Sequence, residues 1–580
     1  MSLGLALNTA LTGIHTVQSS LQVTSNNIAN ANTEGFTRKK VAPISLMVAG
    51  QGSGVSISGI SRQVNESLIR DMRAQLAGIG ALRVDDAFYT RMQDLFGSLE
   101  SGTSLTASVA DLASAFEALA AFPEDNSLRQ QVVGDALKLT RQFNNTARDI
   151  QVMRTDADQG ISESITIINT QLKQISELNT QIARDRAGGQ PTVNLEDKRD
   201  TAITKLAEFI DIGTFPKSSG ELVVVLKTGR VLLDGAPPTL VHTPAAALDV
   251  SVTYPGGIGP IDLNGVDITS ELTGGSIGAQ IKMRDTTLPG LASELNTLAN
   301  GIFTEINRIH NDGVAFPPPN TLTGTRTVAA GDAFAATGTT NIAVTNAAGD
   351  LVAAPIALNL AAYATVGAFV AALNGALGAN GTASIVGGNV VVDATVATNG
   401  IAINENDTSV GGDGVSHYFG LNDFFTGDPT VSLSRNMTVR SDIAANPDLI
   451  SRGELNPAAA LVGDTAVTSG DNKVVQRLAN QFGQSIAFAA SGSLAATTTT
   501  FSDYGAQILS VNATQAAAAG DSLGFNETLF EDIRFRAESD AGVSIDEEMA
   551  NLITLQNSYA AIARVVSVTS DMMDILNQLG

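Results

Sequence analysis

The sequence contains no cysteine, no tryptophan and only four histidines among 580 residues. The absence of cysteine excludes disulfides, thiolate zinc sites and cysteine nucleophiles. His15, His242, His310 and His417 are scattered, and none has a second His, Asp or Glu at metal-ligand spacing in one helical turn. We therefore predict structural or surface roles for the histidines, and we expect no enzyme activity, no cofactor and no metal site.

Basic residues are also scarce, since 34 Lys and Arg stand against 58 Asp and Glu, for a formal net charge of −24. Without a basic stripe to neutralise phosphates, nucleic acid and anionic membrane surfaces are excluded as partners. No apolar run approaches the roughly 18 residues of a membrane span, and the N-terminus lacks the basic and apolar regions of a secretory signal peptide. We expect a soluble chain without membrane insertion, whose export would not use a cleaved signal peptide.

Two glycine-rich stretches lack the features of ligand sites. "GQGSGVSISG", Gly50 to Gly59, has neither the dinucleotide spacing nor a phosphate-loop lysine, and it predicts a flexible turn before a strand. "NENDTSVGGDG", Asn404 to Gly414, misses the alternating ligands and terminal Glu of a calcium loop, and it predicts a plain loop.

Charge is absent from the first 33 residues, and the first charged side chain is Glu34. At the chain's own 16% of charged residues, about five would be expected there. An amphipathic helix ordinarily fills its solvent face with Lys and Glu, whereas this segment uses Asn, Gln, Ser and Thr. The missing charge indicates that the polar face is buried as well, against another chain.

Both ends of the chain carry a heptad pattern of the coiled-coil type, with steps of three and four. The first seam is Leu3, Leu7, Ala10, Ile14, Val17, Leu21, Thr24 and Ile28, and the second is Leu552, Leu555, Tyr559, Ile562, Val566, Thr569, Met573 and Leu576. We predict that these two helices pair with each other. Because a lone helix of this composition is marginal in water, we also predict that Met1 to Arg38 and Ala541 to Gly580 are mobile before assembly.

The polar face of the first helix ends in the stretch "SNNIANANTEGF", Ser25 to Phe36. On a helical wheel Asn26, Asn27 and Asn30 lie opposite the apolar seam, and asparagine is far less costly to bury than a charged side chain. We therefore predict that these three asparagines face a neighbouring subunit. Asn32 and Gly35 fit a helix cap and turn as well as they fit a contact with a neighbouring subunit.

In the middle of the chain, sequence patterns typical of helices alternate with patterns typical of strands. Ser127 to Arg186 and Pro289 to Ile309 keep a three/four apolar spacing, while Gly134 and Gly160 are possible interruptions of the first. Valine- and threonine-rich runs bounded by Gly and Pro predict β-structure in two regions, with one helix at "VGAFVAALNGAL".

We predict an α+β multidomain fold with paired terminal coiled-coil helices, a long helical shaft and β-rich domains inserted outward. The expected divisions are residues 1–45 with 536–580 for the terminal helices; 46–212 with 286–320 and 436–535 for the helical body; 213–285 for a β-rich region; and 321–435 for a β-rich outer insertion.

Several stretches resemble known proteins. "SNNIANANTEGFTR" resembles the N-terminal motif of the bacterial flagellar axial proteins, and "DEEMANLITLQNSYAAIARVVSVTSDMMDIL" is similar to their C-terminal helix. Within that family, "NLEDKRDTAITKLAEFIDI", "LPGLASELNTLANGIFTEINRIHNDGV" and "HYFGLNDFF" look like the members at the hook–filament junction. The resemblance is weak from Pro317 to Ser416.

The resemblance implies a structural, extracellular subunit of the flagellum, exported unfolded by the flagellum-specific type III apparatus and required for filament assembly and motility. Its implied partners are further copies in a ring, hook protein, hook-associated protein 3, and an export chaperone on the C-terminal helix. The residues expected to serve assembly are Leu7, Ile14, Leu21, Asn26, Asn27, Ile28, Asn30, Gly35, Phe36, Asn551, Leu552, Gln556, Tyr559, Ile562, Val566, Met573 and Leu576.

Two alternatives stay open from sequence. One is another axial protein, such as hook-associated protein 3 or hook protein, although the long heptad stretch from Ser127 to Arg186 disfavours the mostly β-structured hook protein. The other is a secreted adhesin or surface-layer protein, which would be expected to contain tandem or calcium-binding repeats.

Overall fold

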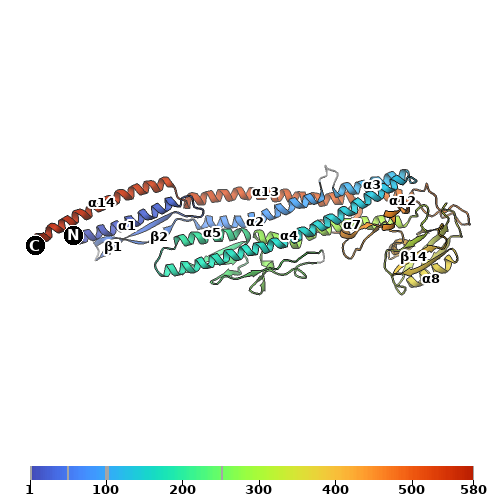
Figure 1. The fold of residues 1–580 in the computed structure, drawn as a ribbon, viewed down its shortest axis with the longest axis horizontal. Coiled ribbons are helices and arrows are strands. Elements are labelled where there is room, and N and C mark those ends of the chain that lie inside the picture. The colour runs from blue at the N-terminus through green and yellow to red at the C-terminus, as the bar shows by residue number, and fades with distance from the viewer. Residues whose placement is uncertain (1–2, 49–50, 98–103, 250–251, 406, 579–580) are drawn as a thin grey trace.

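The computed structural model describes residues 3–48, 51–97, 104–249, 252–405 and 407–578. The molecule is a long rod, with both termini at one end and a compact β-rich domain at the other (Figure 1). The chain runs out along the rod and returns, and each β-rich region is inserted between helices of the shaft. The predicted fold class, with its terminal helices, long shaft and inserted β-regions, is confirmed.

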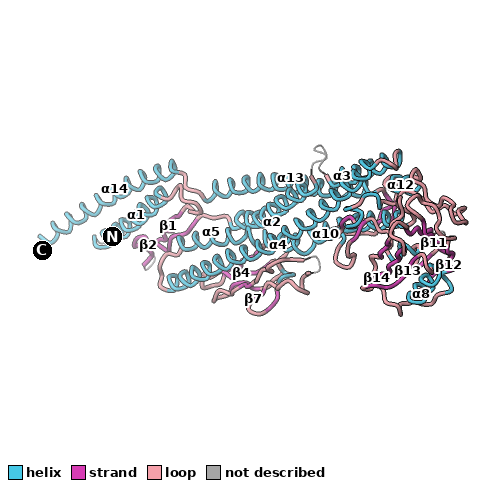
Figure 2. The backbone as a smooth tube through the Cα atoms, turned by 45° about the vertical axis from the view of Figure 1, so that its right-hand side comes forward, coloured by secondary structure: helices cyan, strands magenta, loops and turns pink. Residues whose placement is uncertain are grey.

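The terminal end of the rod combines three elements, which we call the terminal unit. They are helix α1 (Leu3–Ala29), the antiparallel hairpin of β1 (Lys39–Val48) and β2 (Gln51–Arg62), and helix α14 (Ile545–Gln578). Helix α1 lies between α14 and the hairpin (Figures 1 and 2). Most of the Gly50 to Gly59 stretch is therefore strand rather than a flexible turn, and the predicted boundary at residue 45 falls inside β1. The mobility predicted for both ends includes residues 1–2 and 579–580, which lie outside the described residues.

Helices form the shaft. They are α2 (Glu66–Phe96), α3 (Leu105–Ala121), α4 (Asn126–Ala187), α5 (Val193–Phe209), α7 (Leu288–Asn311), α12 (Lys473–Gln481) and α13 (Phe501–Ala541). Helix α4 runs unbroken through Gly134 and Gly160 for 62 residues, or roughly 90 Å. Its N-cap is Asp125, whose carboxylate accepts from the Ser127 amide at 2.8 Å. Their apolar faces pack in two cores, one that joins α2, α3, the first half of α4, α7, α12 and α13, and one that joins the second half of α4 to α5 and the β-rich lobe.

A β-rich lobe packs along α4. Its strands are β3 (Ile212–Pro216), β4 (Leu222–Leu226), β5 (Val231–Leu233), β6 (Leu240–Val241), β7 (Asp262–Leu263) and β8 (Val266–Asp267), in two antiparallel sheets ordered β3-β4-β5 and β6-β7-β8. The predicted end of this region at residue 285 is wrong, because α6 (Gly275–Lys282) and a π-turn (Met283–Thr287) already lead into α7. The helical segment packs its Ile277 and Met283 into the interior.

A buried ionic cluster fastens this lobe to the shaft. One oxygen of Asp158 on α4 accepts from His242 Nε2 at 2.8 Å and from Arg284 at 2.7 Å, and the other accepts from the Ala245 amide at 2.8 Å. Burial opposes ionisation of Asp158, but the hydrogen bonds from His242 and Arg284 outweigh it, so its pKa lies below the usual value.

The outer domain has its own apolar core. Its strands are β9 (Thr321–Thr323), β10 (Ala336–Thr337), β11 (Thr339–Thr345), β12 (Ile356–Asn359), β13 (Gly381–Val386), β14 (Asn389–Ala394), β15 (Gly400–Asn404) and β16 (Ser409–Val410), with the predicted helix α8 at Val366–Leu377. Its three-stranded sheets are ordered β12-β11-β15 and β13-β14-β9. The domain core ends at Leu421, because Phe424 and Phe425 already pack in the shaft, so the predicted boundary at residue 435 is too late.

The segment after the outer domain is less helical than predicted. The described residues also contain the short elements α9 (Val415–Phe419), β17 (Phe425–Thr426), α10 (Leu433–Asn436), β18 (Thr438–Val439), α11 (Ser441–Ala445), β19 (Ile486–Phe488) and β20 (Thr497–Thr499), and short 3-10 turns at Thr269–Glu271, Leu360–Ala362 and Pro447–Leu449. Leu455 and Val467 pack against the outer domain, which accounts for the irregular course of this part of the supposed helical body.

Two buried titratable groups give stability opposite dependences on pH. Burial raises the pKa of Glu405 in the outer domain to about 7, and burial lowers the pKa of His310 on α7 to about 4. The histidine is held neutral, since its Nε2 accepts from the Ser451 amide at 2.9 Å and its Nδ1 donates to the Asn422 carbonyl at 2.6 Å. The stability that Glu405 contributes is complete below its unfolded pKa and is lost as pH rises through 7, whereas the His310 contribution is lost as pH falls below 6.5.

We predict that Glu405→Gln raises the melting temperature of the outer domain at pH 8 and has little effect at pH 5. The difference in unfolding free energy at pH 8 is on the order of 3 kcal/mol. Glu531→Gln, at an exposed site on α13, is the control and leaves the pH profile unchanged. A Glu405→Gln profile parallel to that of the parent would contradict the prediction.

Candidate assembly interface

The two terminal helices pair with each other, as the heptads predict, and the structure shows that they run antiparallel. Ile562 Cδ1 lies 3.4 Å from the position that a Cβ on Gly13 would occupy, and Met573 lies 3.9 Å from the corresponding position on Gly4. Nearer the shaft, Asn551 Nδ2 donates to Thr24 Oγ1 at 3.2 Å. Small residues on α1 thus let the two helices approach closely.

Most predicted seam residues are covered by this pairing. Half-buried positions are Leu7, Ile14, Leu21, Ile28, Leu552, Ile562, Val566 and Met573. Tyr559 lies at the rim, and Leu576 is 62% exposed. Asn551 and Gln556 are also exposed.

Helix α1 has a third face, which neither α14 nor the hairpin covers. Its exposed residues follow one another at steps of three and four, and they are Asn8, Leu11, His15, Gln18, Gln22 and Ser25. None of these residues is Asp, Glu, Lys or Arg. We call this stripe the open face of α1.

Helix α14 carries a second apolar stripe beside the seam that meets α1. It consists of Ala561, Val565, Val568, Met572 and Ile575, again at steps of four and three, and each of the last four is more than half exposed. In heptad terms these are the c and g positions, adjacent to the a/d seam. We call this stripe the second seam of α14. The sequence reasoning missed it, although its spacing was visible.

The structure corrects the prediction for Asn27, which is buried inside the chain. Its amide donates to the Lys39 carbonyl at 2.9 Å and to Glu548 at 3.2 Å, and its oxygen accepts from the Lys39 amide at 3.1 Å. Asn27 therefore holds the hairpin base and α14 against α1 and does not face a neighbour. Asn26 is exposed and Asn30 is half-buried, so for these two the prediction stands as a prediction.

The end of the asparagine stretch is a turn. Helix α1 ends at Ala29, and Gly35 has a φ of +74°, where a Cβ would lie 2.4 Å from Thr201 Oγ1 on α5. Only glycine fits that position without moving α5. Phe36 is half-buried, and the Lys39 ammonium lies 3.2 Å from its ring centroid. Gly35 and Phe36 therefore position the terminal unit on the shaft.

A network of ion pairs, which we call the joint, links the terminal unit to the shaft. Arg38 pairs with Glu547 and Glu548, both at 2.6 Å, and its amide donates to the Ala541 carbonyl at 2.8 Å. The buried Lys39 pairs with Asp197 on α5 at 2.5 Å.

Two further arginines complete the joint. Arg62 contacts Asp200 at 2.5 Å and Glu196 at 3.1 Å, while Arg73 on α2 contacts Asp200 at 2.9 Å. Burial opposes ionisation of Asp200, but the two guanidinium groups lower its pKa below the usual value. Sequence reasoning missed the joint. The signal that could have revealed it is a pair of short runs of opposite charge beside the charge-poor terminal segments: the basic run Arg38 to Lys40 follows the first segment, and the acidic run Asp546 to Glu548 precedes the last.

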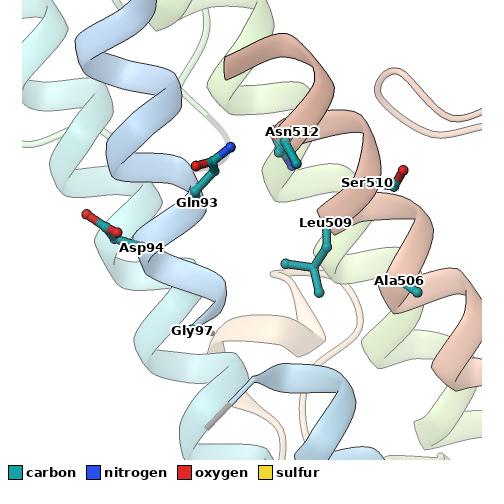
Figure 3. Close-up of a pocket in the computed structure, with 8 residues that line it drawn as sticks. Gln93, Asp94, Gly97, Ala506, Leu509, Ser510 and Asn512 are labelled. Atoms are coloured by element: carbon teal, nitrogen blue, oxygen red, sulfur yellow. The ribbon is translucent and has the colours of Figure 1, made fainter. Parts of the chain in front are cut away.

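Two hollows lie near opposite ends of α2. A cleft of about 420 Å³ at the joint is bounded by the turn at Gly35 and by α2, α5 and α13. A second, of about 520 Å³, lies between α2 and α13 and is lined by Gln93, Leu509 and Asn512 among others (Figure 3). Its edge at Gly97 adjoins residues outside the described part of the chain, and we assign it no ligand.

The histidines lie apart from the terminal seam. His15 is exposed on the open face of α1, His242 and His310 are buried, and His417 is half-buried. Within the described residues, no three His, Cys, Asp or Glu side chains are grouped so that they could hold a metal ion. None of the described helices combines the length and apolarity needed to cross a membrane.

We predict that Asn26→Lys with Asn30→Lys blocks filament attachment without lowering the melting temperature of the free chain, because Asn26 is exposed on α1 and Asn30, in the turn just beyond it, is only half-buried. Asn27→Ala should instead remove the acceptor of the Lys39 amide and speed its hydrogen exchange, since lost buried hydrogen bonds cost about 1–3 kcal/mol. Normal filaments on cells carrying the double lysine variant would contradict the first expectation, and unchanged exchange at Lys39 the second.

Three family models match the chain. The model described as "Flagellar hook-associated protein FlgK helical domain" matches residues 89–324, "Flagella basal body rod protein" matches residues 7–37, and "Flagellar basal body rod FlgEFG protein C-terminal" matches residues 537–579. The latter two cover α1 with its turn and α14, the helices that form the terminal seam.

Curated relatives share the same description. "Flagellar hook-associated protein 1" of Escherichia coli K12 is 25% identical over 98% of this chain and 98% of its own length. The protein of the same description from Salmonella typhimurium LT2 is 25% identical over 53% of this chain and 56% of its own length, and that of Bacillus subtilis 168 is 24% identical over 40% and 48%.

A solved structure, that of the flagellar hook junction protein FlgK from Burkholderia pseudomallei, covers 81% of this chain and all of its own, at 16% identity and a TM-score of 0.47. The chain is therefore similar to flagellar hook-associated protein 1 over nearly its whole length, and its termini match models of flagellar axial proteins.

Proposed function

We propose that this chain is a structural subunit of the bacterial flagellum that forms the junction between hook and filament and permits the filament to assemble. The matching family models and its full-length relatives support a structural role in the axial part of the flagellum. The observation that carries the proposal is that both terminal helices keep faces suited to further helices, which a single chain leaves uncovered.

The second seam of α14 is the stronger part of this observation. A helix with a/d and c/g stripes has two adjacent apolar faces and can pack on two neighbours at once. Helix α1 of the same chain occupies the first. The remaining side of α14 is polar and carries the charged residues Arg564, Asp571 and Asp574. When one face of each copy binds a different face of the next copy, the copies assemble head to tail into a ring or a helical array.

Several partners follow as parts of the proposal. The ring of copies sits between hook protein on one side and hook-associated protein 3 on the other. Before assembly, an export chaperone covers the apolar stripes of the C-terminal helix, which would otherwise expose two faces to water. The chain reaches the cell exterior through the flagellar type III apparatus, and an unfolded chain without cysteine forms no disulfides on the way.

Deletion of the gene, followed by complementation, tests the junction role. Cells without the gene should bear hooks without filaments and should release flagellin into the medium, and the complementing chain should restore filaments. Electron microscopy and an immunoblot of the medium give both readouts. Loss of the hooks themselves would indicate a rod or hook protein and would overturn the proposal.

A further inference from the structure

The β1–β2 hairpin shares the unusual composition of α1. From Val41 to Ser61 it contains no charged residue, although much of β1 faces solvent. Ile44 and Leu46 are exposed, and Met47 is 68% exposed. Among the described strands β1 pairs only with β2, so its outer edge is open. An uncharged, apolar and open strand is a surface that proteins ordinarily cover.

The hairpin and the second seam of α14 lie on opposite flanks of the terminal unit. Their levels meet where Leu46 lies beside Thr12 and Ala561 begins the second seam next to Ile562, from which the seam continues towards the end of the rod. The Val55 amide donates to Thr12 Oγ1 at 3.2 Å, and Leu46 pairs with Gly54, which abuts Thr12. On the other flank, α14 passes from Ile562 beside Gly13 to Met573 beside Gly4. Figures 1 and 2 show α1 between these two flanks.

The two surfaces also match in length and in charge. The second seam from Ala561 to Ile575 is about 21 Å long at the rise of a helix, and β1 from Val41 to Met47 is about 20 Å long at the rise of a strand. Neither surface contains a charged residue. Their contact would therefore bury apolar side chains without desolvating an ion.

We propose that the second seam of α14 in one copy packs against strand β1 of the hairpin in the next copy. The proposal rests on the proposed function, because it assumes that copies assemble side by side. It makes the contact head to tail, with the α14 flank of each copy meeting the hairpin flank of its neighbour, and such a contact repeats around a ring. A face-to-face pairing of two α14 helices would join only two copies and would leave Ile44, Leu46 and Met47 exposed.

Cysteine cross-linking tests this contact, and the chain offers a cysteine-free background. We would place Leu46→Cys or Met47→Cys together with Val568→Cys or Met572→Cys, giving four double variants, and oxidise flagella isolated from a complemented deletion strain. At least one pair should give a ladder of dimers, trimers and higher oligomers, while each single variant stays monomeric. The control pair, Met47→Cys with Ser570→Cys, places the second thiol on the polar side of α14 and should give no ladder.

The outcomes distinguish failure of the proposed hairpin contact from failure of the proposed function. Filaments without a ladder from any of the four pairs would overturn the hairpin contact alone. Dimers from Val568→Cys by itself would overturn it in favour of α14 pairing with α14. If the cysteine-free chain fails to restore filaments in the deletion strain, the proposed function itself falls.

Discussion

Replacing Val565 and Val568 by aspartate should abolish filament attachment while leaving the free chain folded. Both side chains are more than half exposed in the single chain, so their loss removes little packing, and surface substitutions of this kind usually change stability by less than about 0.5 kcal/mol. In the assembly each aspartate would place an unpaired carboxylate inside an apolar contact, which costs several kcal/mol per copy. We expect filaments per cell to fall by about 100-fold or more, with flagellin accumulating in the medium.

A matched control uses the polar side of the same helix. Ser567→Asp with Ser570→Asp adds the same two charges to α14 at exposed positions outside both seams. This variant should assemble filaments at a level close to that of the parent. Normal filaments on cells carrying the Val565 and Val568 replacements would contradict the role given to the second seam.

Removal of Asp197 should detach the base of the hairpin from the shaft. Its carboxylate lies 2.5 Å from the buried Lys39 ammonium and accepts from Thr37 Oγ1 at 2.7 Å. Breaking a buried ion pair by deleting one partner costs about 3–5 kcal/mol, because the other charge stays buried without compensation. In Asp197→Ala we expect trypsin cleavage after Lys39 or Lys40 to accelerate by about 10²- to 10³-fold, while the shaft keeps its melting temperature.

An exposed ion pair provides the comparison. Arg91 and Asp156 lie 2.7 Å apart with both side chains about half exposed, so Asp156→Ala should cost less than about 1 kcal/mol and should leave cleavage at the hairpin unchanged. If the parent chain were already cleaved after Lys39 as fast as the Asp197 variant, the joint would not be formed in the free chain and its assigned role would be wrong.

The helices and their pairing were predictable from sequence because apolar residues spaced by three and four mark the face of a helix that packs against a partner. The seams through Ile14 and Ile562 marked two helices with matching stripes, and the long apolar repeat through Ile161 and Ile175 marked α4. The same periodicity would have revealed the second seam of α14 had both apolar stripes been counted. Register and direction were not predictable, because they depend on where small residues such as Gly13 allow close approach.

The errors share a physical cause, which is contact with segments that are distant in the sequence. A helical wheel grouped Asn27 with Asn26 and Asn30, but a wheel contains no information about the hairpin that comes back to Asn27 through Lys39. The glycines from Gly50 to Gly59 suggested a turn because strand alternation is weak where serine and glycine replace apolar residues. The joint brings Arg38, Asp197 and Glu548 together from three distant segments, and no local pattern predicts that meeting.

Amide hydrogen exchange on the free chain and on isolated hook–filament junctions tests most directly the claim that the terminal unit is completed by neighbouring copies. The account predicts that in the free chain exchange is fast in the parts of α1, the hairpin and α14 that lie beyond the joint, and that the same amides are strongly protected in the assembled junction, with the joint and the shaft helices protected in both. Strong protection of both terminal helices in the free chain, or unprotected terminal amides in the junction, would contradict it.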